Sequence, residues 1–408
     1  MKAIQFDVSV PRYLLGKALG ALYRPLYWSG LSCLRYGDVA EPTLPGPEWV
    51  KIKTRYGGIC GSDWGLIHLQ NGPYLSPFGS DRFILGHENL GTIVEMGDQV
   101  SGWSIGQRVI ADIMLPCEPR GFAEPCPSCQ RGDYNLCQRF AEGAIAPGTI
   151  LGTCADTGGS WGPFFVAHRS QLVAVPDNVS DENAILLDAL CSALHPVLRD
   201  FPENGQTALV LGAGTIGLCT IASLRALGSQ AQIVALAKYP FQVELGQQYG
   251  ADEVLLLGRD QDHYRALAEL TGAKLYQPPL GKPAMVGGAD IAYECVGNGN
   301  SVDDGLKLVA PGGKFVLIGL AGKPKNVDLT PIWFHELTVK GAYTIATETF
   351  QGRRMRTYEV GLELMAKDKL DLSPLLTHRF RLSEYRRAFQ FLSAKGQNRV
   401  LKAVFTFE

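Results

Sequence analysis

Two patterns of hydrophobic residues divide the chain. Up to about residue 175, short β-type runs alternate with glycine and proline, as in WVKIKTRYGG, GTIVEMG and QRVIADIM, which is typical of a barrel-like or antiparallel β domain. From about residue 205, strand-like runs alternate with helical ones: TALVLGAG precedes TIGLCTIASLRALG, and AQIVALA precedes PFQVELGQQYGA. Such alternation indicates a parallel, doubly wound sheet. The sequence therefore predicts an α/β protein with two unlike domains.

Composition narrows the class of protein. The chain has 408 residues, 46 % of them hydrophobic and 19 % charged, which excludes a disordered or fibrous protein. The 38 basic and 40 acidic residues leave a net charge of −2, and without a basic run we expect no nucleic-acid partner. There is no apolar stretch of about 18 residues and no signal-peptide pattern at the start. We therefore expect a cytoplasmic protein without a membrane partner.

Residues 11–30, PRYLLGKALGALYRPLYWSG, stand out from this pattern. They combine apolar residues with Arg12, Lys17 and Arg24, and a short amphipathic element is one interpretation. A surface or subunit-contact insertion is the interpretation we favour, because short membrane-binding helices are rare.

A glycine-rich turn carries the clearest binding signal. Gly212-Ala-Gly214-Thr215-Ile216-Gly217 follows an apolar strand and opens a helix. The first glycine allows a tight turn, the second lets the backbone approach a pyrophosphate, and the third lets helix and strand pack closely. The helix N-terminus then favours the anion. We predict a dinucleotide site here rather than three turn glycines without a ligand.

The residues after this turn favour NADP over NAD. An NAD site usually has an acid about 20 residues on, bonded to the ribose, yet no Asp or Glu occurs between Leu218 and Val243. The second strand ends instead at Ala237-Lys238-Tyr239. A small residue followed by a cation leaves room for a 2′-phosphate, unless Lys238 is only a solvated loop residue.

The ten cysteines are unevenly distributed along the chain. Because no secretory signal is seen, we interpret the clustered cysteines as metal ligands and expect a reducing compartment. Cys126, Cys129 and Cys137 have the spacing x2 and x7, close to that of a structural zinc loop, and Cys117 can complete a four-thiolate site. Elsewhere, GICGSD contains Cys60 and LGHE contains His87. Thiolate and imidazole suit zinc, but each residue alone is more often a structural one.

The order of these motifs resembles the medium-chain dehydrogenase/reductase superfamily, in its zinc-dependent alcohol and polyol dehydrogenase branch. The resemblance covers nearly the whole chain. It rests on GGICGSD, LGHENLGTIVEMG, the cysteine loop, LVLGAGTIGL, ECVGN, APGGKFVLIGL and ELTVKGAY. It implies a GroES-like catalytic domain over residues 1–189 and 344–408, a Rossmann domain over 190–343, and a homo-oligomer, either a dimer or a tetramer.

The resemblance also implies the roles of individual residues. Cys60 and His87 look like catalytic zinc ligands. Asp188, seven residues before His195, looks like the third ligand. Cys191 is the alternative third ligand, but it lies three residues away from the family position. Glu88 resembles either the acid beside the zinc-bound histidine or an exchanging ligand. Asp63 resembles the carboxylate that orients His87. Ser62 resembles the hydroxyl that passes on the substrate proton. The structural zinc lobe would be formed by Cys117, Cys126, Cys129 and Cys137. The nicotinamide would lie near Cys295, Val296 and Gly297 and near Ile318, Gly319 and Leu320.

The chain departs from the family pattern at three places. Eight residues separate Cys117 from Cys126 where the family has two, and residues 11–30 and 273–288 look like insertions. We expect two zinc ions, one catalytic and one structural, and hydride transfer between an alcohol, polyol or sugar hydroxyl and NAD(P), with NADP favoured. The alternatives are an NADP(H)-binding redox sensor or scaffold with structural zinc only, and a zinc-free quinone or enoyl reductase.

Overall fold

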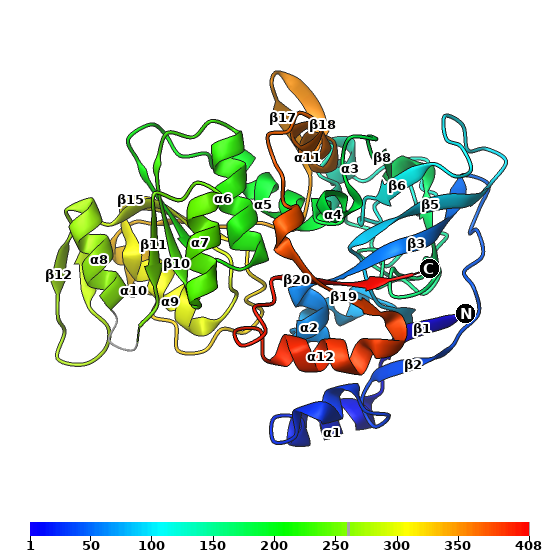
Figure 1. Cartoon of the computed structure of the whole chain (residues 1–408), viewed down its shortest axis with the longest axis horizontal. Helices are drawn as coiled ribbons and strands as arrows, with labels where there is room; N and C mark the ends of the chain where they lie inside the picture. Colours follow the sequence, from blue (N-terminus) through cyan, green and yellow to red (C-terminus); the bar gives the residue numbers. More distant parts are fainter. Residues whose placement is uncertain (259–261, 408) are drawn as a thin grey trace. The chain divides into compact units, whose positions relative to one another are not determined.

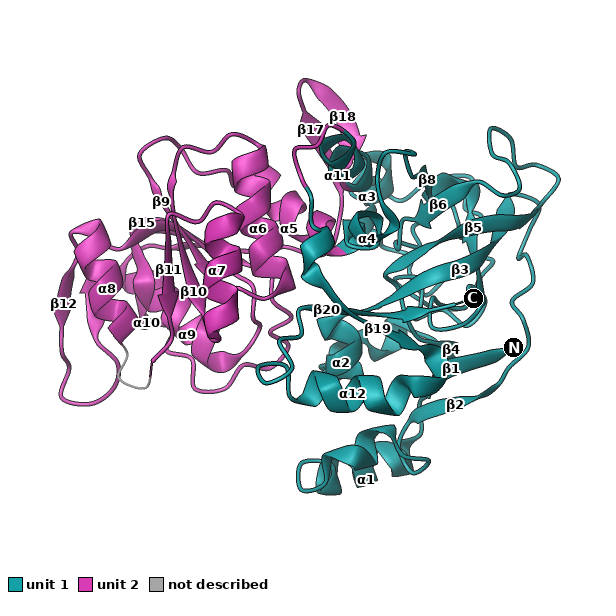
Figure 2. Cartoon of the chain, viewed as in Figure 1, with its two compact units in different colours: residues 1–188, 358–366, 371–408 teal, residues 189–357, 367–370 magenta. Residues whose placement is uncertain are grey.

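The computed structural model describes residues 1–258 and 262–407, which form two compact units (Figure 2). The first contains residues 1–188, 358–366 and 371–408, and the second residues 189–357 and 367–370. Residues 344–357, predicted to belong to the catalytic domain, lie with the second unit. The reason is that their hairpin is bonded there: Glu348 accepts a hydrogen bond from His195.

The first unit is built mainly from antiparallel sheet (Figure 1). One sheet has the order β2-β1-β4, and another has the order β19-β20-β3-β5-β6-β8 with β7 also paired to β3. The strands are β1 Lys2–Asp7, β2 Leu34–Asp38, β3 Trp49–Ile59, β4 Arg82–Ile84, β5 Asn89–Met96, β6 Arg108–Ala111, β7 Phe164–His168, β8 Leu172–Ala174, β19 Leu376–Arg381 and β20 Lys402–Thr406. The helices are α1 Val10–Leu19, α2 Gly61–Ile67, α3 Pro127–Gln130, α4 Asp181–Ala184, α11 Thr357–Ala366 and α12 Tyr385–Ser393.

The segment 11–30 forms α1 and a short 3-10 helix, Arg24–Trp28, and the ring of Trp28 lies 6.1 Å from that of Trp64 in α2. Gly16 is required at the contact, because a Cβ there would lie 2.7 Å from Leu69. The Tyr27 ring lies 4.6 Å from that of His68, centroid to centroid. Val10 and Leu14 of α1 stay more than half exposed. The insertion therefore covers the helix that follows Cys60.

The second unit is the predicted parallel, doubly wound sheet, with the strand order β11-β10-β9-β14-β15-β16. Its central strand β9 is entirely buried, as its apolar run requires. The strands are β9 Thr207–Leu211, β10 Gln232–Ala237, β11 Glu253–Leu256, β14 Ala289–Glu294, β15 Val309–Leu317 and β16 Thr338–Gly341. The helices are α5 Leu187–Arg199, α6 Thr215–Ala226, α7 Pro240–Gln248, α8 Asp262–Thr271, α9 Gly299–Leu308 and α10 Thr330–Phe334.

Two hairpins extend the second unit beyond this sheet. The predicted insertion 273–288 forms β12 Lys274–Tyr276 and β13 Ala284–Val286, and a second hairpin comprises β17 Thr347–Phe350 and β18 Arg353–Arg356. In the described part of the chain, no helix has the length and apolar character that a membrane crossing needs.

Candidate active site

Three predicted metal ligands converge in the first unit. One ligand atom each from Cys60, His87 and Glu88 lies within 4.8 Å of the others. Cys60 precedes α2 directly, at the end of β3. His87 and Glu88 follow Gly86, whose φ of +94° and close approach to Trp161 leave no room for a side chain. Local turn chemistry therefore places the thiol, the imidazole and the carboxylate at one point.

Asp188 approaches the same point from the start of α5. Its Oδ2 lies 4.0 Å from Nε2 of His87, and its Oδ1 accepts a hydrogen bond of 2.7 Å from the Tyr358 hydroxyl. Burial raises the pKa of Asp188, although the charge of His87 acts in the opposite direction. Tyr358 was missed at the sequence level, because it lies 170 residues away along the chain.

Asp63 and Ser62 both lie close to the His87 ring. Asp63 Oδ1 lies 3.4 Å from His87 Nδ1, and Oδ2 accepts the Cys60 backbone N–H at 2.9 Å. Burial alone would lower the pKa of His87, but the charge and hydrogen bond of Asp63 raise it well above its ordinary value. Ser62 Oγ lies 3.4 Å from His87 Nε2. Asp63 thus leaves Nε2 facing the other ligands.

A buried ion pair completes the cluster. Lys402 Nζ donates to Glu88 Oε1 at 2.5 Å, and both side chains are almost wholly buried. Burial lowers the pKa of Lys402, but the charges of Glu88, Cys60 and Asp188 and the hydrogen bond to Glu88 together outweigh burial, so the net shift of the pKa is upward. A Cβ on Gly58 would lie 2.0 Å from Glu88 Oε2, so this glycine makes room for the carboxylate. Lys402 was not predicted, since 314 residues separate it from Glu88.

These residues fit a zinc ion. A thiolate, an imidazole and carboxylate oxygens are the donors that zinc takes in catalytic sites. Glu88 Oε2 is buried and has no hydrogen-bond partner among the described residues, although buried carboxylate oxygens are normally satisfied. Such an orphaned oxygen beside Cys60 and His87 is consistent with an exchanging ligand or an outer-shell acid.

The four predicted lobe cysteines also meet. One Sγ from each of them lies within 4.8 Å of the rest, and all four residues are buried: Cys117, Cys126, Cys129 and Cys137. A hydrogen bond from Cys129 lowers the pKa of Cys137 to about 6. Four thiols crowded in this way can ionise together only around a cation.

The long spacing after Cys117 is accommodated by a buried arginine. Arg120 is 1 % exposed, and it donates to the carbonyls of Leu115 at 2.9 Å and Glu142 at 2.8 Å, among others. These bonds tie the extra residues to the following loop, so the insertion leaves the four sulfurs together.

The glycine-rich turn joins β9 to α6 as expected. Gly212 has a φ of +96°, and a Cβ on Gly217 would lie 1.8 Å from the Gly212 carbonyl oxygen. Gly214 caps α6, and without a side chain of its own it leaves the first helical N–H groups open to a ligand. Thr215 and Ile216, which open the helix, are half-buried. Backbone donors and helix dipole thus make an anion site suited to a pyrophosphate.

Two further predicted loops adjoin this turn at the carboxyl edge of the sheet. A Cβ on Gly212 would lie 2.3 Å from the Val296 side chain, and one on Gly319 would lie 2.3 Å from the Gly297 nitrogen. The Glu294 carboxylate accepts the N–H groups of Val296 and Gly297 at 3.0 and 2.9 Å. The remaining members of the loops are Cys295, Ile318 and Leu320. Ligands of open α/β sheets bind at this edge.

The end of β10 places Lys238 beside an aromatic ring. Ala237 is buried and Lys238 is exposed, and its Nζ lies 5.6 Å from the centroid of the Tyr239 ring. The Lys238 backbone N–H is held by Gln242 Oε1 at 3.0 Å. The ammonium group is therefore partly steered by a cation–π contact.

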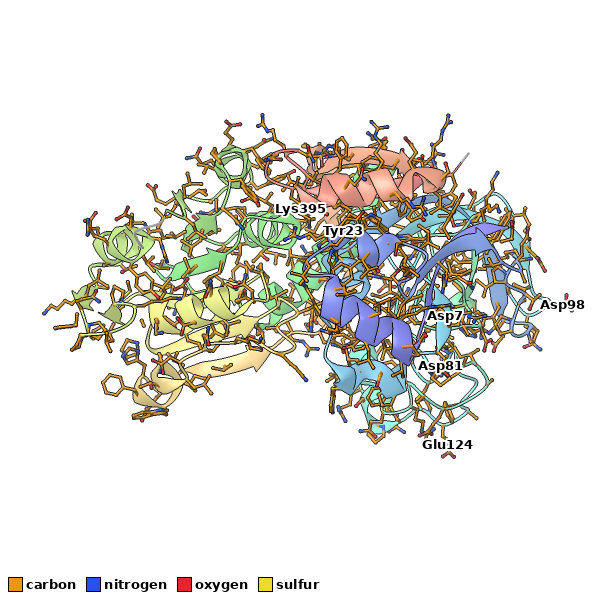
Figure 3. All side chains as sticks on the ribbon, turned by 90° about the horizontal axis from the view of Figure 1, so that it is seen from below. Asp7, Tyr23, Asp81, Asp98, Glu124 and Lys395 are labelled. Atoms are coloured by element: carbon orange, nitrogen blue, oxygen red, sulfur yellow. The ribbon has the colours of Figure 1, made fainter. Side chains whose placement is uncertain are left out.

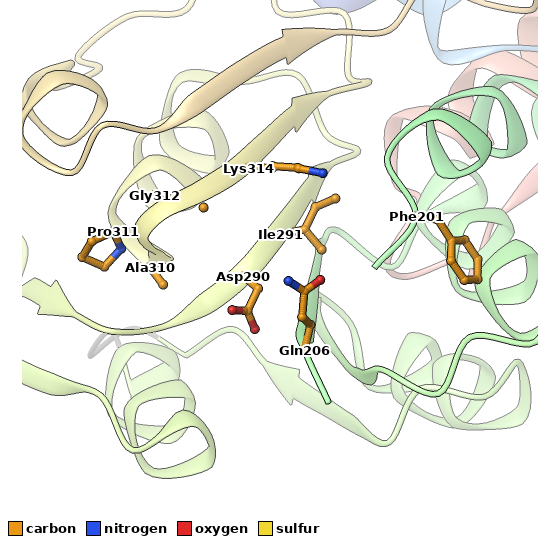
Figure 4. A pocket seen from close by; sticks show the side chains of 9 residues that line it. Phe201, Gln206, Asp290, Ile291, Ala310, Pro311, Gly312 and Lys314 are labelled. Atoms are coloured by element: carbon orange, nitrogen blue, oxygen red, sulfur yellow. The ribbon is translucent and has the colours of Figure 1, made fainter. Parts of the chain in front are cut away.

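Other features of the second unit lie away from these groups. A cavity of about 130 Å³ is lined by Gln206, Asp290, Lys314 and their neighbours (Figure 4), where β9, β14 and β15 begin. The cavity therefore lies at the opposite sheet edge from Gly212.

Among the described residues, Cys191 belongs to neither of the two groups of possible metal ligands. Its Sγ donates to the Thr357 carbonyl.

The comparisons with known proteins agree with this geometry. Residues 46–177 match the model of the alcohol dehydrogenase GroES-like domain, and residues 215–359 match that of zinc-binding dehydrogenases. L-idonate 5-dehydrogenase from Vitis vinifera is 29 % identical over 394 residues, 96 % of each chain. Sorbitol dehydrogenase from Halalkalibacterium halodurans is 28 % identical over 362 residues, 88 % of this chain and 94 % of the relative.

Solved structures show the same fold. The crystal structure of 2R,3R-butanediol dehydrogenase from Bacillus subtilis superimposes with a TM-score of 0.71 at 23 % identity, covering 100 % of this chain and 99 % of the other. Fold and family matches together define a zinc-dependent alcohol dehydrogenase, an oxidoreductase of CH–OH donors. The chain belongs to the medium-chain dehydrogenase/reductase superfamily, in its zinc-dependent branch.

Proposed function

We propose that the protein oxidises a secondary hydroxyl of a polyol or sugar, or reduces the matching carbonyl, with NADP as the favoured cofactor. The observation that carries the proposal is the convergence of Cys60, His87 and Glu88, with Asp188 beside His87. Zinc bound by these side chains would supply the Lewis acidity that favours an alkoxide, and the nicotinamide would supply the hydride acceptor.

The surrounding side chains have distinct tasks in this proposal. Asp63 fixes the ring of His87, and Ser62, 3.4 Å from the same imidazole, takes up the substrate proton and passes it toward solvent. Tyr358 orients Asp188, and Lys402 neutralises Glu88 inside the protein. Loops 295–297 and 318–320 would hold the nicotinamide ring.

Catalytic zinc separates this proposal from the two alternatives. A sensor or scaffold with structural zinc only, or a zinc-free quinone or enoyl reductase, would have no use for Cys60, His87 and Asp188. Metal analysis of the purified protein tests the point, and we expect two zinc ions per chain. A single ion, together with full activity, would contradict the proposed chemistry.

The substrate class comes from the relatives and is tested by a screen. Among them are enzymes named for L-idonate, sorbitol and D-xylulose, which are polyols, sugars or sugar acids. NADP- and NAD-linked oxidation of polyols, aldoses and small secondary alcohols should show turnover with a polyol or sugar derivative. Activity confined to simple primary alcohols would contradict this class.

Cofactor choice gives a separate prediction. We expect NADP to bind about 10- to 150-fold more tightly than NAD, the value of one charge-assisted contact between Lys238 and the 2′-phosphate. Ala237→Asp should reverse the order, because its carboxylate repels the phosphate and can accept a bond from the ribose hydroxyl. Fluorescence titration of the wild type and of Ala237→Asp with NADP and with NAD measures the four affinities.

A matched variant identifies the source of the preference. Lys238→Met should bring the two affinities together while NAD binding changes little, and added salt should reduce the wild-type preference because the exposed ion pair is screened. Equal wild-type affinities, or tighter NAD binding, would show that Lys238 stays on Tyr239 and does not meet a phosphate.

A further inference from the structure

Lys395 differs from the other lysines that are withdrawn from solvent. Five described lysines are buried or half-buried, and four of them have a carboxylate oxygen within 2.8 Å of Nζ: Lys51, Lys282, Lys307 and Lys402. The fifth, Lys395, is half-buried and forms no ion pair or side-chain hydrogen bond with any residue that the structure describes. It is labelled in Figure 3.

The fold places Lys395 near the metal ligands of the first unit. Strand β20 pairs with β3 so that Ala403 lies opposite Ile59, which brings Lys402, the first residue of β20, alongside Cys60. The turn between α12 and β20 is closed by a bond from the Val400 N–H to the Lys395 carbonyl at 3.0 Å. Accordingly, Lys402 and Cys60 are the charged groups that act on the Lys395 ammonium.

No acid of the centre is available to neutralise this ammonium. Glu88 is paired with Lys402, Asp63 with the Cys60 N–H and His87, and Asp188 accepts from Tyr358. Burial, reinforced by the charge of Lys402, lowers the pKa of Lys395 against the opposing effect of Cys60. A half-buried cation without a paired carboxylate costs free energy that an arriving anion recovers.

We infer that Lys395 binds an anionic group of the substrate, a carboxylate or a phosphate, while the hydroxyl to be oxidised occupies the centre formed by Cys60 and His87. The inference rests on the proposed function and narrows it: a sugar acid or a polyol phosphate is preferred over the neutral polyol. One enzyme among the relatives is named for such an anion, L-idonate.

L-idonate and L-iditol form a matched pair of probes, because they differ only in a carboxylate that replaces a terminal CH₂OH group. We expect Lys395→Met to raise KM for L-idonate about 10- to 150-fold, the value of one charge-assisted hydrogen bond, and to leave KM for L-iditol and kcat nearly unchanged. Lys395→Arg should restore most of the loss. Titration calorimetry of the zinc-loaded protein without cofactor should show the same loss of L-idonate affinity.

The controls separate the possible outcomes. Lys53→Met removes an exposed lysine of the same unit and should change neither KM. The inference would be overturned if the wild type used L-idonate and L-iditol equally well, or if Lys395→Met left the affinity for L-idonate unchanged. The proposed function is tested separately, by polyol oxidation and by the presence of two zinc ions. Weaker NADP binding with unchanged L-idonate binding would also overturn the inference, because the ammonium would then serve the cofactor's phosphates.

Discussion

Asp188→Ala should lose its catalytic zinc, and turnover should fall by more than about 100-fold, since loss of even an outer-shell partner of a metal ligand costs 10- to 100-fold. The carboxylate lies 4.0 Å from His87 Nε2 and is oriented by Tyr358. The fold should persist, because the charged form of a buried carboxylate is disfavoured by burial and its removal relieves that cost. Zinc content, turnover and melting temperature are measured together.

The neighbouring cysteine serves as the control for that prediction. Cys191 lies one turn further along α5, and its thiol donates to the Thr357 carbonyl. The Cys191→Ala variant should therefore keep both zinc ions and most of its activity. Asp188→Asn preserves the shape but is a poorer ligand, and it should resemble the alanine variant. Two zinc ions and full activity in Asp188→Ala would refute the assignment of the third ligand.

Cys126→Ser should destabilise the protein far more than it changes its chemistry. A closed four-thiolate site contributes its metal-binding free energy directly to folding. We expect a loss of at least about 3 kcal/mol, or roughly 6–12 °C in melting temperature for a domain of this size. One of the two zinc ions should be lost, and kcat of the remaining folded protein should change little.

Cys33→Ser provides a matched substitution outside both cysteine-containing groups. Cys33 is buried, and its Sγ lies 3.9 Å from the Ser9 carbonyl, so its replacement should cost about 1 kcal/mol and no zinc. An unchanged melting temperature and two zinc ions in Cys126→Ser would show that the four cysteines do not hold a metal.

Much of the site could be predicted because its chemistry is local in the sequence. The turn from Gly212 to Gly217 needs small residues at fixed offsets, and the thiols from Cys126 to Cys137 are brought together by short loops. The division into a β-rich and a strand–helix half followed from hydrophobic periodicity. Residues 344–357 lie with the second unit, and a short polar hairpin has no periodicity that would place it there; its hydrogen bond to α5 decides where it lies.

The sequence by itself determined the fold class, the family, the glycine turn and the cysteine cluster, since periodicity, turn geometry and short ligand spacings act between near neighbours. Tertiary structure alone decided which distant side chains support the centre. Tyr358 reaches Asp188 across 170 residues and Lys402 reaches Glu88 across 314. The pairing of β20 with β3 also sets Ala403 opposite Ile59, and so brings Lys402 alongside Cys60. Such contacts depend on sheet register and helix packing, which are set by the whole core and leave no local pattern at the residues themselves.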